Sequence, residues 1–272
     1  MKKRLSDTDA MRLFGDYMKV TGVPSDKDEA PGEDPGLNGK KLGVVNSGSW
    51  MHLWSVYFGK LLLPGVKIIN SGNDGVQLNF IRAHHQGEAV PPEINIENFC
   101  KQARDLYELQ QVDAVLISCS TMNRAFTKVK EEMAGFAVPV IQIDEAMMEE
   151  AVNTGGKILV VATHGPTVKS TQALLQETAD RLGKKVDFAG ATIEEAFDAL
   201  GEGDVRAHNE LIANAIRKSQ KKQDIDIVVL AQLTMTVFTF SYPDPVTTFG
   251  IPVLSSGVTG FRRAGEILKQ RH

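Results

Sequence analysis

The sequence predicts an α/β fold in which two lobes with parallel sheets are related by a pseudo-twofold axis. Three observations lead to this prediction. Short aliphatic strands alternate with helical segments from about residue 41 onward. The strands are apolar without polar interruption, which is typical of parallel sheets covered by helices on both faces. The second half of the chain also repeats the first half, and an N-terminal extension, residues 1–40, precedes both.

The N-terminal extension is predicted to form a helix and a linker. Ser6 is placed to cap a helix over the first twenty residues, with Asp9 three positions further on. Residues 21–40 hold three prolines, four glycines and a cluster of charges, so they form a linker or a surface strap rather than a core element. The sequence leaves open whether this segment covers a cleft or joins an interface.

The main unit is predicted to span residues 41–272, and its elements follow from the spacing of apolar residues. In the first half, aliphatic runs at 42–46, 66–70, 114–118 and 138–143 are short enough for strands. Segments 94–108, 122–133 and 145–152 carry apolar side chains three and four positions apart, which is typical of helices. In the second half, the same patterns predict strands at 158–162, 227–230 and 253–254, and helices at 168–182, 208–221 and 258–269.

An internal repeat divides this unit into two equivalent halves. The segment DAVLISCSTM at 113–122 aligns with DIVVLAQLTM at 226–235, an offset of 113 residues. LGVVNS at 42–47 aligns with ILVVAT at 158–163 at an offset of 116, so the two offsets differ by one small loop insertion. Chance similarity between buried strands explains one such match, but not several in the same order. We therefore expect a duplicated α/β unit with an active site between its lobes.

Polar residues follow the predicted strands at the ends where ligands bind in open α/β sheets. Their hydroxyl and backbone N–H groups can surround one anion, and no glycine-rich dinucleotide or phosphate motif follows a strand. We therefore predict a small carboxylate as the ligand rather than a nucleotide, and no cofactor. The predicted substrate-binding residues are Asn46, Ser47, Ser49, Ser120, Thr121, Thr163 and Thr234.

Cys119 and Gln232 occupy equivalent positions in the repeat, which places them on opposite walls of the predicted cleft. Cys119 stands where a strand meets a helix, so its sulfur is a candidate for proton transfer or nucleophilic attack. The alternative is a thiol buried as core filler, and the flanking serine and threonine residues weigh against it. Cys100 lies within a predicted helix and is expected to be structural.

These residues carry a resemblance to a known family. The segments DAVLISCSTM, IDEAMMEEAV at 143–152, VVATHGPTVKST at 160–171 and VLAQLTM at 229–235 resemble the aspartate/glutamate racemase superfamily, over about residues 41–270. That superfamily includes glutamate, aspartate and hydantoin racemases, maleate isomerase and arylmalonate decarboxylase. The resemblance implies two α/β lobes, cofactor-free chemistry next to a carboxylate, and two opposed cysteines that act as acid and base.

One of the two cysteines that the resemblance implies is replaced. Cys119 matches the first, whereas Gln232 stands where the second is expected, as in a subgroup of uncharacterised racemase-like proteins. An amide can orient a substrate but cannot be the opposite base. His164, which follows a strand, is the first candidate for that role, with a surface loop position as its alternative. Asp74 and the pair Asp144–Glu145 are further candidates, with a turn and a helix start as their alternatives.

The favoured function is therefore a cofactor-independent enzyme, racemase- or isomerase-like, with Cys119, His164 and Gln232 as its catalytic residues. Two alternatives stay open. One is a decarboxylase or lyase that uses Cys119 as its single base, and the other is a catalytically inactive protein that binds a carboxylate. The resemblance also allows a homo-oligomer.

Composition excludes several other classes of function. The 272 residues carry a net charge of −4, which gives no basic surface for nucleic acid. Apolar runs are too short for a membrane span, and two cysteines cannot form a disulfide framework or a cysteine-only zinc site. His84 and His85 are expected at a helix end rather than at a metal. Trp50 and Trp54 are expected on one packed helix face, with a cleft wall as the alternative for Trp50. We expect a cytoplasmic protein that holds no metal.

Overall fold

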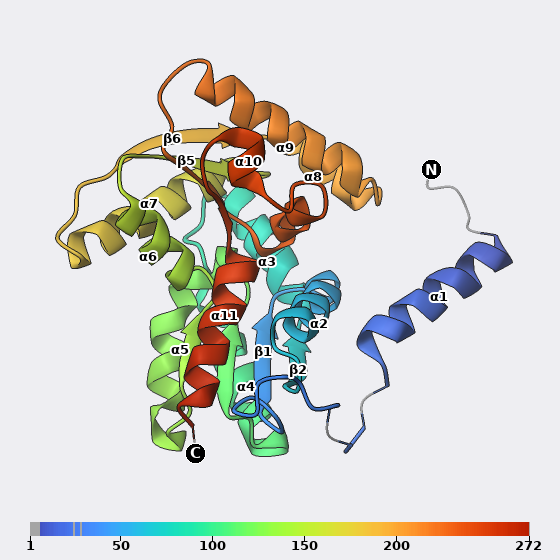
Figure 1. Ribbon diagram of the computed structural model, residues 1–272. Coiled ribbons are helices and arrows are strands. Elements are labelled where there is room, and N and C mark those ends of the chain that lie inside the picture. The colour runs from blue at the N-terminus through green and yellow to red at the C-terminus, as the bar shows by residue number, and fades with distance from the viewer. Residues whose placement is uncertain (1–5, 24, 28, 272) are drawn as a thin grey trace.

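Two four-stranded parallel sheets form the centre of the molecule, one in the lower lobe and one in the upper lobe of Figure 1. The computed structural model describes residues 6–23, 25–27 and 29–271, with only the backbone described at Asp7, Ser49, Gly165 and Pro166. Helices cover the sheets, and an N-terminal helix projects from the lower lobe. The predicted α/β class, with two lobes and an N-terminal extension, is confirmed.

The lower lobe is built around a sheet with strand order β2-β1-β3-β4. Its strands are β1 (Lys41–Asn46), β2 (Lys67–Gly72), β3 (Ala114–Ile117) and β4 (Val140–Gln142). The helices that follow these strands are α2 (Ser49–Leu62), α3 (Asp74–His85), α4 (Glu93–Gln110) and α5 (Phe126–Met133), with short 3₁₀ helices η1 (Ser120–Ala125) and η2 (Ala134–Phe136). Buried aliphatic side chains of β1 and β3 occupy the core, as their uninterrupted apolar runs predict.

The upper lobe has the corresponding strand order, β6-β5-β7-β8. Its strands are β5 (Lys157–Ala162), β6 (Asp187–Thr192), β7 (Ile227–Leu230) and β8 (Val253–Ser255). Its helical segments are α7 (Gly165–Arg181), α8 (Glu194–Gly201), α9 (Val205–Gln220), η3 (Leu233–Phe240) and α10 (Pro245–Phe249). Helices α6 (Glu145–Thr154) and α11 (Ser256–Lys269) connect the two lobes.

The two sheets share their pairing register as well as their strand order. Leu42 of β1 pairs with Ala114 of β3, and Ile158 of β5 pairs with Ile227 of β7, positions that differ by the offsets of the sequence repeat. A side-chain hydrogen bond is also repeated. Asp113 accepts one from the Lys41 backbone N–H at 2.8 Å, and the carboxylate at the equivalent position 226 accepts one from the backbone N–H of residue 157 at 2.6 Å. Residues that follow β3 and β7 therefore reach equivalent positions in the two lobes.

The lobes exchange one helix each. Helix α6 follows β4 of the lower lobe, but its side chains Met147 and Ala151 pack against the β5 and β7 side chains of the upper lobe. Helix α11 follows β8 of the upper lobe, but Phe261 and Leu268 pack in the core of the lower lobe, along which α11 runs in Figure 1. The chain thus crosses between the lobes just before α6 and α11. The two crossing segments are in close contact at Gly260 of α11, where an added Cβ would lie only 2.5 Å from the Ile143 side chain.

Some elements differ from the prediction. Strand β6 and helix α8 were not predicted, because β6 is an edge strand with exposed residues and lacks an uninterrupted apolar run. The helix predicted at 122–133 begins as the 3₁₀ helix η1 and continues as α5. The histidines His84 and His85 lie at the exposed C-terminal end of α3.

The N-terminal extension begins with helix α1 (Asp7–Thr21), which Ser6 caps by accepting a hydrogen bond from the Asp9 N–H at 3.1 Å. The strap that follows is fixed to the body, since Lys67 Nζ donates to two of its carbonyl oxygens at 2.6 and 2.9 Å. Leu37 is buried in the lower core, so the strap contributes one core residue where a purely surface segment was predicted. No helix within the described ranges is long and apolar enough to cross a membrane.

Candidate active site

A small cavity lies between the lobes, at the carboxyl ends of β3, β5 and β7. It has a volume of about 40 Å³, which is enough for only a few water molecules. It is lined by Trp50, Met51, Gln77, Cys119, Ser120, Thr121, His164, Phe197, Gln232, Leu233 and Thr234. An organic acid is larger than this volume, so its entry requires lining side chains or lobes to move apart.

Cys119 lies on the lower-lobe wall of the cavity, two residues after β3. Its side chain is only 3% exposed. The sulfur lies 2.9 Å from the Ser47 hydroxyl oxygen and 3.1 Å from the Thr121 hydroxyl oxygen. A hydroxyl can accept a proton from a thiol and can donate one to a thiolate, so these partners can support either form. The sulfur thus borders both the core and the cavity.

Gln232 lies on the opposite wall, two residues after β7. Its Oε1 accepts hydrogen bonds from the Thr163 backbone N–H at 2.8 Å and from the Thr163 hydroxyl at 2.9 Å. Because both donors occupy the amide oxygen, the amide nitrogen is the end that Gln232 can offer to a ligand. Thr163 is the upper-lobe equivalent of Ser47. Each lobe therefore places a hydroxyl beside its cavity-lining residue, Cys119 or Gln232.

His164 shares the upper wall with an aromatic neighbour. Its ring centroid lies 4.4 Å from that of Phe197. Burial lowers the pKa of His164, and the nearby carboxylates of Glu194 and Asp198 oppose that shift. The imidazole is therefore neutral at neutral pH and can accept a proton from a ligand in the cavity.

The remaining predicted binding residues divide into three groups. Ser120, Thr121 and Thr234 line the cavity, whereas Ser47 and Thr163 hold the side chains of Cys119 and Gln232. Asn46 is buried and lies outside the cavity lining. Its amide donates to Asn70 of β2 at 3.3 Å and accepts from the Gly48 N–H at 3.3 Å, so it joins strand ends rather than facing a ligand. Ser49 is the first residue of α2, and its side chain lies outside the described part of the chain.

Asp144 lies behind the lower wall of the cavity, at the first crossing between the lobes. It is 1% exposed, and its Oδ1 accepts a hydrogen bond from the Ser120 hydroxyl at 3.0 Å. Burial raises the pKa of Asp144 to about 6, although the hydrogen bond from Ser120 favours the charged form. Within the described chain, Asp144 Oδ2 and Ser256 Oγ are buried and stand outside hydrogen-bonding geometry with any partner.

The predicted helix-start role of the pair Asp144–Glu145 is divided between the two residues. Asp144 occupies the N-cap position of α6 but makes no side-chain cap, whereas Glu145 is exposed in the first turn. Neither residue lines the cavity, and Asp74 lies in the first turn of α3, also outside the lining. Of the second bases considered from the sequence, His164 alone is among the residues that line the cavity.

Sequence reasoning missed part of the lining. Gln77 and Phe197 lie at the fourth positions of α3 and α8, which follow β2 and the unpredicted β6. Trp50 is 40% exposed and lines the cavity, so its predicted core role is wrong. Trp54, one turn later, packs against the lower core as predicted.

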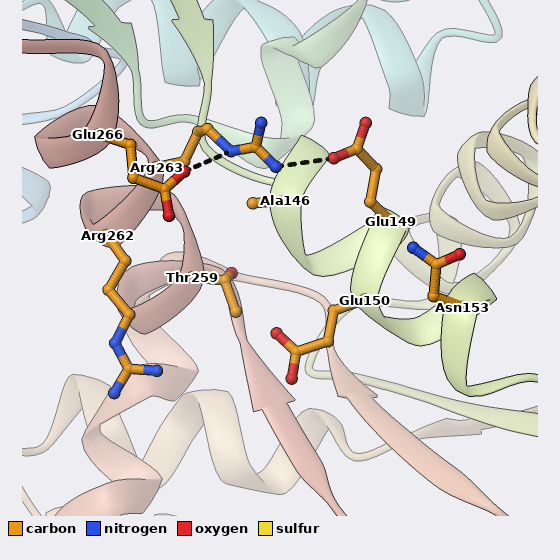
Figure 2. A pocket seen from close by; sticks show the side chains of 8 residues that line it. All are labelled: Ala146, Glu149, Glu150, Asn153, Thr259, Arg262, Arg263 and Glu266. Carbon is orange, nitrogen blue, oxygen red and sulfur yellow. Dashed lines mark hydrogen bonds and ion pairs between the residues drawn. The ribbon is translucent and has the colours of Figure 1, made fainter. Parts of the chain in front are cut away.

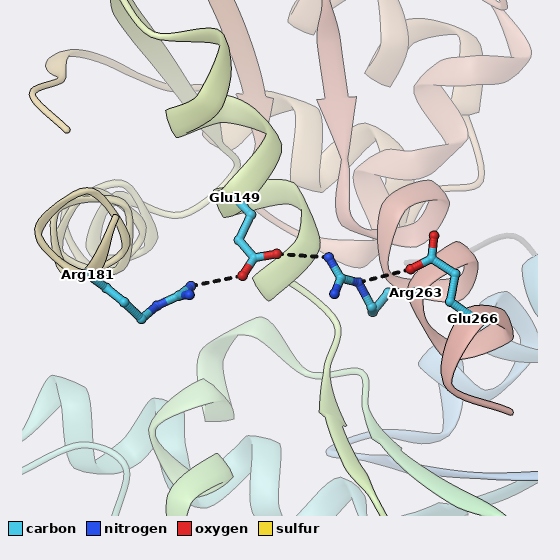
Figure 3. A network of polar contacts seen from close by, with 4 residues as sticks. All are labelled: Glu149, Arg181, Arg263 and Glu266. Atoms are coloured by element: carbon cyan, nitrogen blue, oxygen red, sulfur yellow. Dashed lines mark hydrogen bonds and ion pairs between the residues drawn. The ribbon is translucent and has the colours of Figure 1, made fainter. Parts of the chain in front are cut away.

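A larger cavity, of about 370 Å³, lies away from this site between α6 and α11 (Figure 2). Its lining includes Glu149, Arg263 and Glu266, together with Ala146, Glu150, Asn153, Thr259 and Arg262. Glu149 bridges Arg181 at 3.1 Å and Arg263 at 2.9 Å, and Arg263 also contacts Glu266 at 3.4 Å (Figure 3). These ion pairs join α7, α6 and α11, so they connect the exchanged helices.

The described residues contain no group of three or more His, Cys, Asp or Glu side chains that could bind a metal ion. None of the described residues before Lys41 lines the interlobe cavity. The cysteine, the imidazole and the amide converge in the smaller cavity. We therefore place the candidate active site there rather than between α6 and α11.

Solved structures of two racemases and of a decarboxylase share this fold. Glutamate racemase RacE1 from Bacillus anthracis matches with a TM-score of 0.60 and 16% identity, over 86% of this chain and 83% of that one. Allantoin racemase from Klebsiella pneumoniae matches with a TM-score of 0.59 and 16% identity, over 85% and 89% of the chains. A cysteine-for-glycine mutant of arylmalonate decarboxylase matches with a TM-score of 0.57 and 17% identity, over 84% and 93%.

Sequence comparison supplies the family. The comparison with curated proteins finds no match. The model of the Asp/Glu/Hydantoin racemase family matches residues 79–264, which is more than half of the chain and includes Cys119, His164 and Gln232. The resemblance on which the sequence analysis relied is confirmed at the level of the superfamily. The chain belongs to the Asp/Glu/Hydantoin racemase family.

Proposed function

We propose that the chain is a racemase- or isomerase-like enzyme that moves a proton at the carbon next to the carboxylate of a small acid. Cys119 is the proton-transferring group, and the reaction needs no cofactor. One observation carries the proposal: the Cys119 sulfur borders the interlobe cavity between the hydroxyls of Ser47 and Thr121. A thiol held in this way can exchange its proton with carbon while hydroxyl partners compensate the change in charge.

The opposite wall supports the intermediate of such a reaction. Removing a proton next to a carboxylate shifts negative charge onto the carboxylate oxygens. The amide nitrogen of Gln232 is the free end of a side chain whose oxygen Thr163 fixes with two hydrogen bonds. A donor that is already oriented toward developing charge stabilises it without reorganising during the reaction. Gln232 is thus proposed to hold an oxygen of the substrate, and Thr234 lies on the same wall.

His164 is the proposed group for proton transfer on the face of the reacting carbon opposite Cys119. Racemisation requires one group that removes the proton from one face and another that supplies a proton to the other face. Burial lowers the pKa of His164, so the neutral ring can act as a base opposite Cys119 at neutral pH. In this scheme Cys119 and His164 exchange the roles of acid and base for the two enantiomers, and Gln232 orients the substrate.

A one-base reaction is the second candidate, and the amide at position 232 favours it. In a decarboxylation, the bond between the reacting carbon and the departing carboxylate breaks and CO₂ leaves. The electron pair stays on the carbon, Cys119 supplies the proton, and solvent restores the thiol. An elimination would likewise use Cys119 alone. Neither reaction requires a titratable group where Gln232 stands.

Solvent exchange tests these alternatives with the full-length protein. Amino acids, hydroxy acids and malonates are incubated with it in D₂O, and deuterium at the α-carbon and the configuration are followed by NMR and chiral chromatography. Exchange with loss of configuration supports the two-base reaction. Exchange with retained configuration, or a decarboxylated product carrying one deuterium, supports the one-base reaction. Acids that raise the melting temperature without any exchange or turnover would identify a binding protein and contradict the proposal.

A further inference from the structure

Four side chains form one hydrogen-bonded row on the lower wall of the cavity. Thr121 Oγ1 lies 3.1 Å from Cys119 Sγ, and Cys119 Sγ lies 2.9 Å from Ser47 Oγ. Ser47 in turn donates to Gln77 Oε1 at 2.9 Å. Gln77 also lines the cavity, from helix α3. The row therefore joins the proposed proton-transferring sulfur to an amide on another element.

The Gln77 oxygen sets the direction of the row. An amide oxygen can only accept, so the single hydroxyl proton of Ser47 is directed to Gln77. Ser47 can then only accept from Cys119, whose sulfur carries the proton in this arrangement. Thr121 is left to donate to the sulfur. All three bonds run in the same direction, an order in which each bond strengthens the next.

We propose that Gln77 is a positioning residue that acts through Ser47 to keep Cys119 in its thiol form. The resting site then already carries the proton that the reaction delivers to carbon. The use of this proton rests on the proposed function, whereas the direction of the row does not. Gln77 is assigned no contact with the reacting carbon, so its effect passes through the Ser47 hydroxyl.

The equivalent residues of the upper lobe do not form such a hydrogen-bonded row. The position equivalent to Gln77 is the fourth residue of α8, Phe197, whose ring contacts His164 instead of a hydroxyl. The hydroxyl equivalent to that of Ser47 belongs to Thr163, and it donates directly to Gln232. The two lobes therefore keep the same framework, but only the lower lobe combines a thiol, a hydroxyl and a proton-accepting amide.

The same row can also follow the proton when it leaves. After Cys119 protonates carbon, its sulfur is a thiolate and can only accept. Ser47 then turns its proton from Gln77 to the sulfur. That turn leaves Gln77 Oε1 without its donor, and the lost hydrogen bond is the cost that opposes the thiolate. A methionine at position 77 would fill similar space but offer neither end of an amide.

The pH dependence of thiol alkylation tests this proposal without any substrate. Iodoacetamide reacts with the thiolate, forming an S–C bond as iodide leaves, and mass spectrometry measures the adduct on the peptide that contains Cys119. Gln77→Met removes the acceptor of the Ser47 proton, which then turns to the sulfur. We expect the alkylation midpoint to fall by about half to one pH unit, the effect of losing one neutral hydrogen bond. Gln77→Glu keeps an oxygen acceptor and adds negative charge, so its midpoint should rise above that of the wild type.

Two controls separate the row from general disturbance of α3. In a Ser47→Ala background, Gln77→Met should cause no further shift, because the connecting hydroxyl is gone. Asn79→Leu, on the same helix but outside the cavity, should leave the midpoint unchanged. An unchanged midpoint in Gln77→Met, or an equal shift with and without Ser47, would overturn the proposal. Failure of the proposed function would be recognised separately, because turnover would then survive the removal of Cys119.

Discussion

Replacing Asp144 by asparagine is expected to stabilise the protein at neutral pH. Asp144 is buried at the crossing between the lobes, where Ser120 donates to one of its oxygens at 3.0 Å. Burial raises the pKa of Asp144 from 3.8 to about 6. Asparagine has nearly the same shape and can still accept from Ser120, but it carries no charge at any pH. The substitution therefore removes the cost of burying the carboxylate.

The size of the effect follows from the difference between the folded and unfolded pKa values. The folded state binds the Asp144 proton more tightly than the unfolded state, so its stability is highest when the group is protonated and falls as pH rises between about 4 and 6. A pKa difference of about two units corresponds to about 3 kcal/mol, which is the full cost above pH 6. Asp144→Asn should be more stable than the wild type by up to about 3 kcal/mol at pH 7.5, and the gap should close toward pH 4.

Thermal unfolding from pH 4 to 8 measures this difference. Each kcal/mol corresponds to a melting-temperature change of about 2–4 °C for a chain of this size. Glu145→Gln, at the exposed neighbouring position, is the matched control and should show no comparable gain. A variant less stable than the wild type at pH 7.5 would mean that a partner stabilises the buried carboxylate. A gap that does not change with pH would mean that Asp144 binds its proton equally in the folded and unfolded states, and either outcome would overturn the prediction.

Three further predictions concern the site and the ion pairs. Gln232→Cys restores a titratable group opposite Cys119 and should raise the ratio of racemisation to retained exchange, as measured by chiral chromatography after reaction in D₂O; an unchanged ratio would argue that the two walls do not face the same carbon. His164→Asn removes the proposed second base, so deuterium should enter from the Cys119 face only, and undiminished racemisation would exclude the histidine. Glu149→Ala breaks the bridge between α7 and α11 and should lower the free energy of unfolding by about 1 kcal/mol in urea titrations at low salt. That loss should shrink at high salt, and a loss independent of salt would point to packing instead.

The repeat made the central pair predictable from sequence. Cys119 and Gln232 follow strands with the same apolar pattern, and parallel strands bring their carboxyl ends to one edge. Their equivalence therefore needed no knowledge of side-chain geometry. The roles of Ser47 and Thr163 were less accessible, because a hydroxyl after a strand can face a ligand or a neighbouring side chain with equal ease. The structure directs both toward the pair rather than toward the cavity alone.

Other features of the site depend on tertiary contacts, which the apolar pattern of a single strand or helix does not reveal. Phe197 lies on the helix that follows β6, an edge strand in which exposed residues interrupt the apolar run. Gln77 follows the predicted strand β2, but its hydrogen bond to Ser47 is a tertiary contact. Asp144 looks like an ordinary helix-start residue in the sequence, and its burial results from the exchange of α6 and α11 between the lobes. Trp50 has the spacing of a core residue but is the second residue of α2 and lines the cavity.

A comparison of the two cysteines tests whether Cys119 is the group that transfers the proton. Cys100 is buried in α4, outside the cavity, where burial raises the pKa of its thiol. Deuterium incorporation next to the carboxylate of the best substrate is measured by NMR for the wild type, Cys119→Ala and Cys100→Ala. Cys119→Ala should lose at least about 100-fold in rate, whereas Cys100→Ala should retain wild-type exchange. Exchange that continues at the wild-type rate in Cys119→Ala would contradict the role proposed for Cys119.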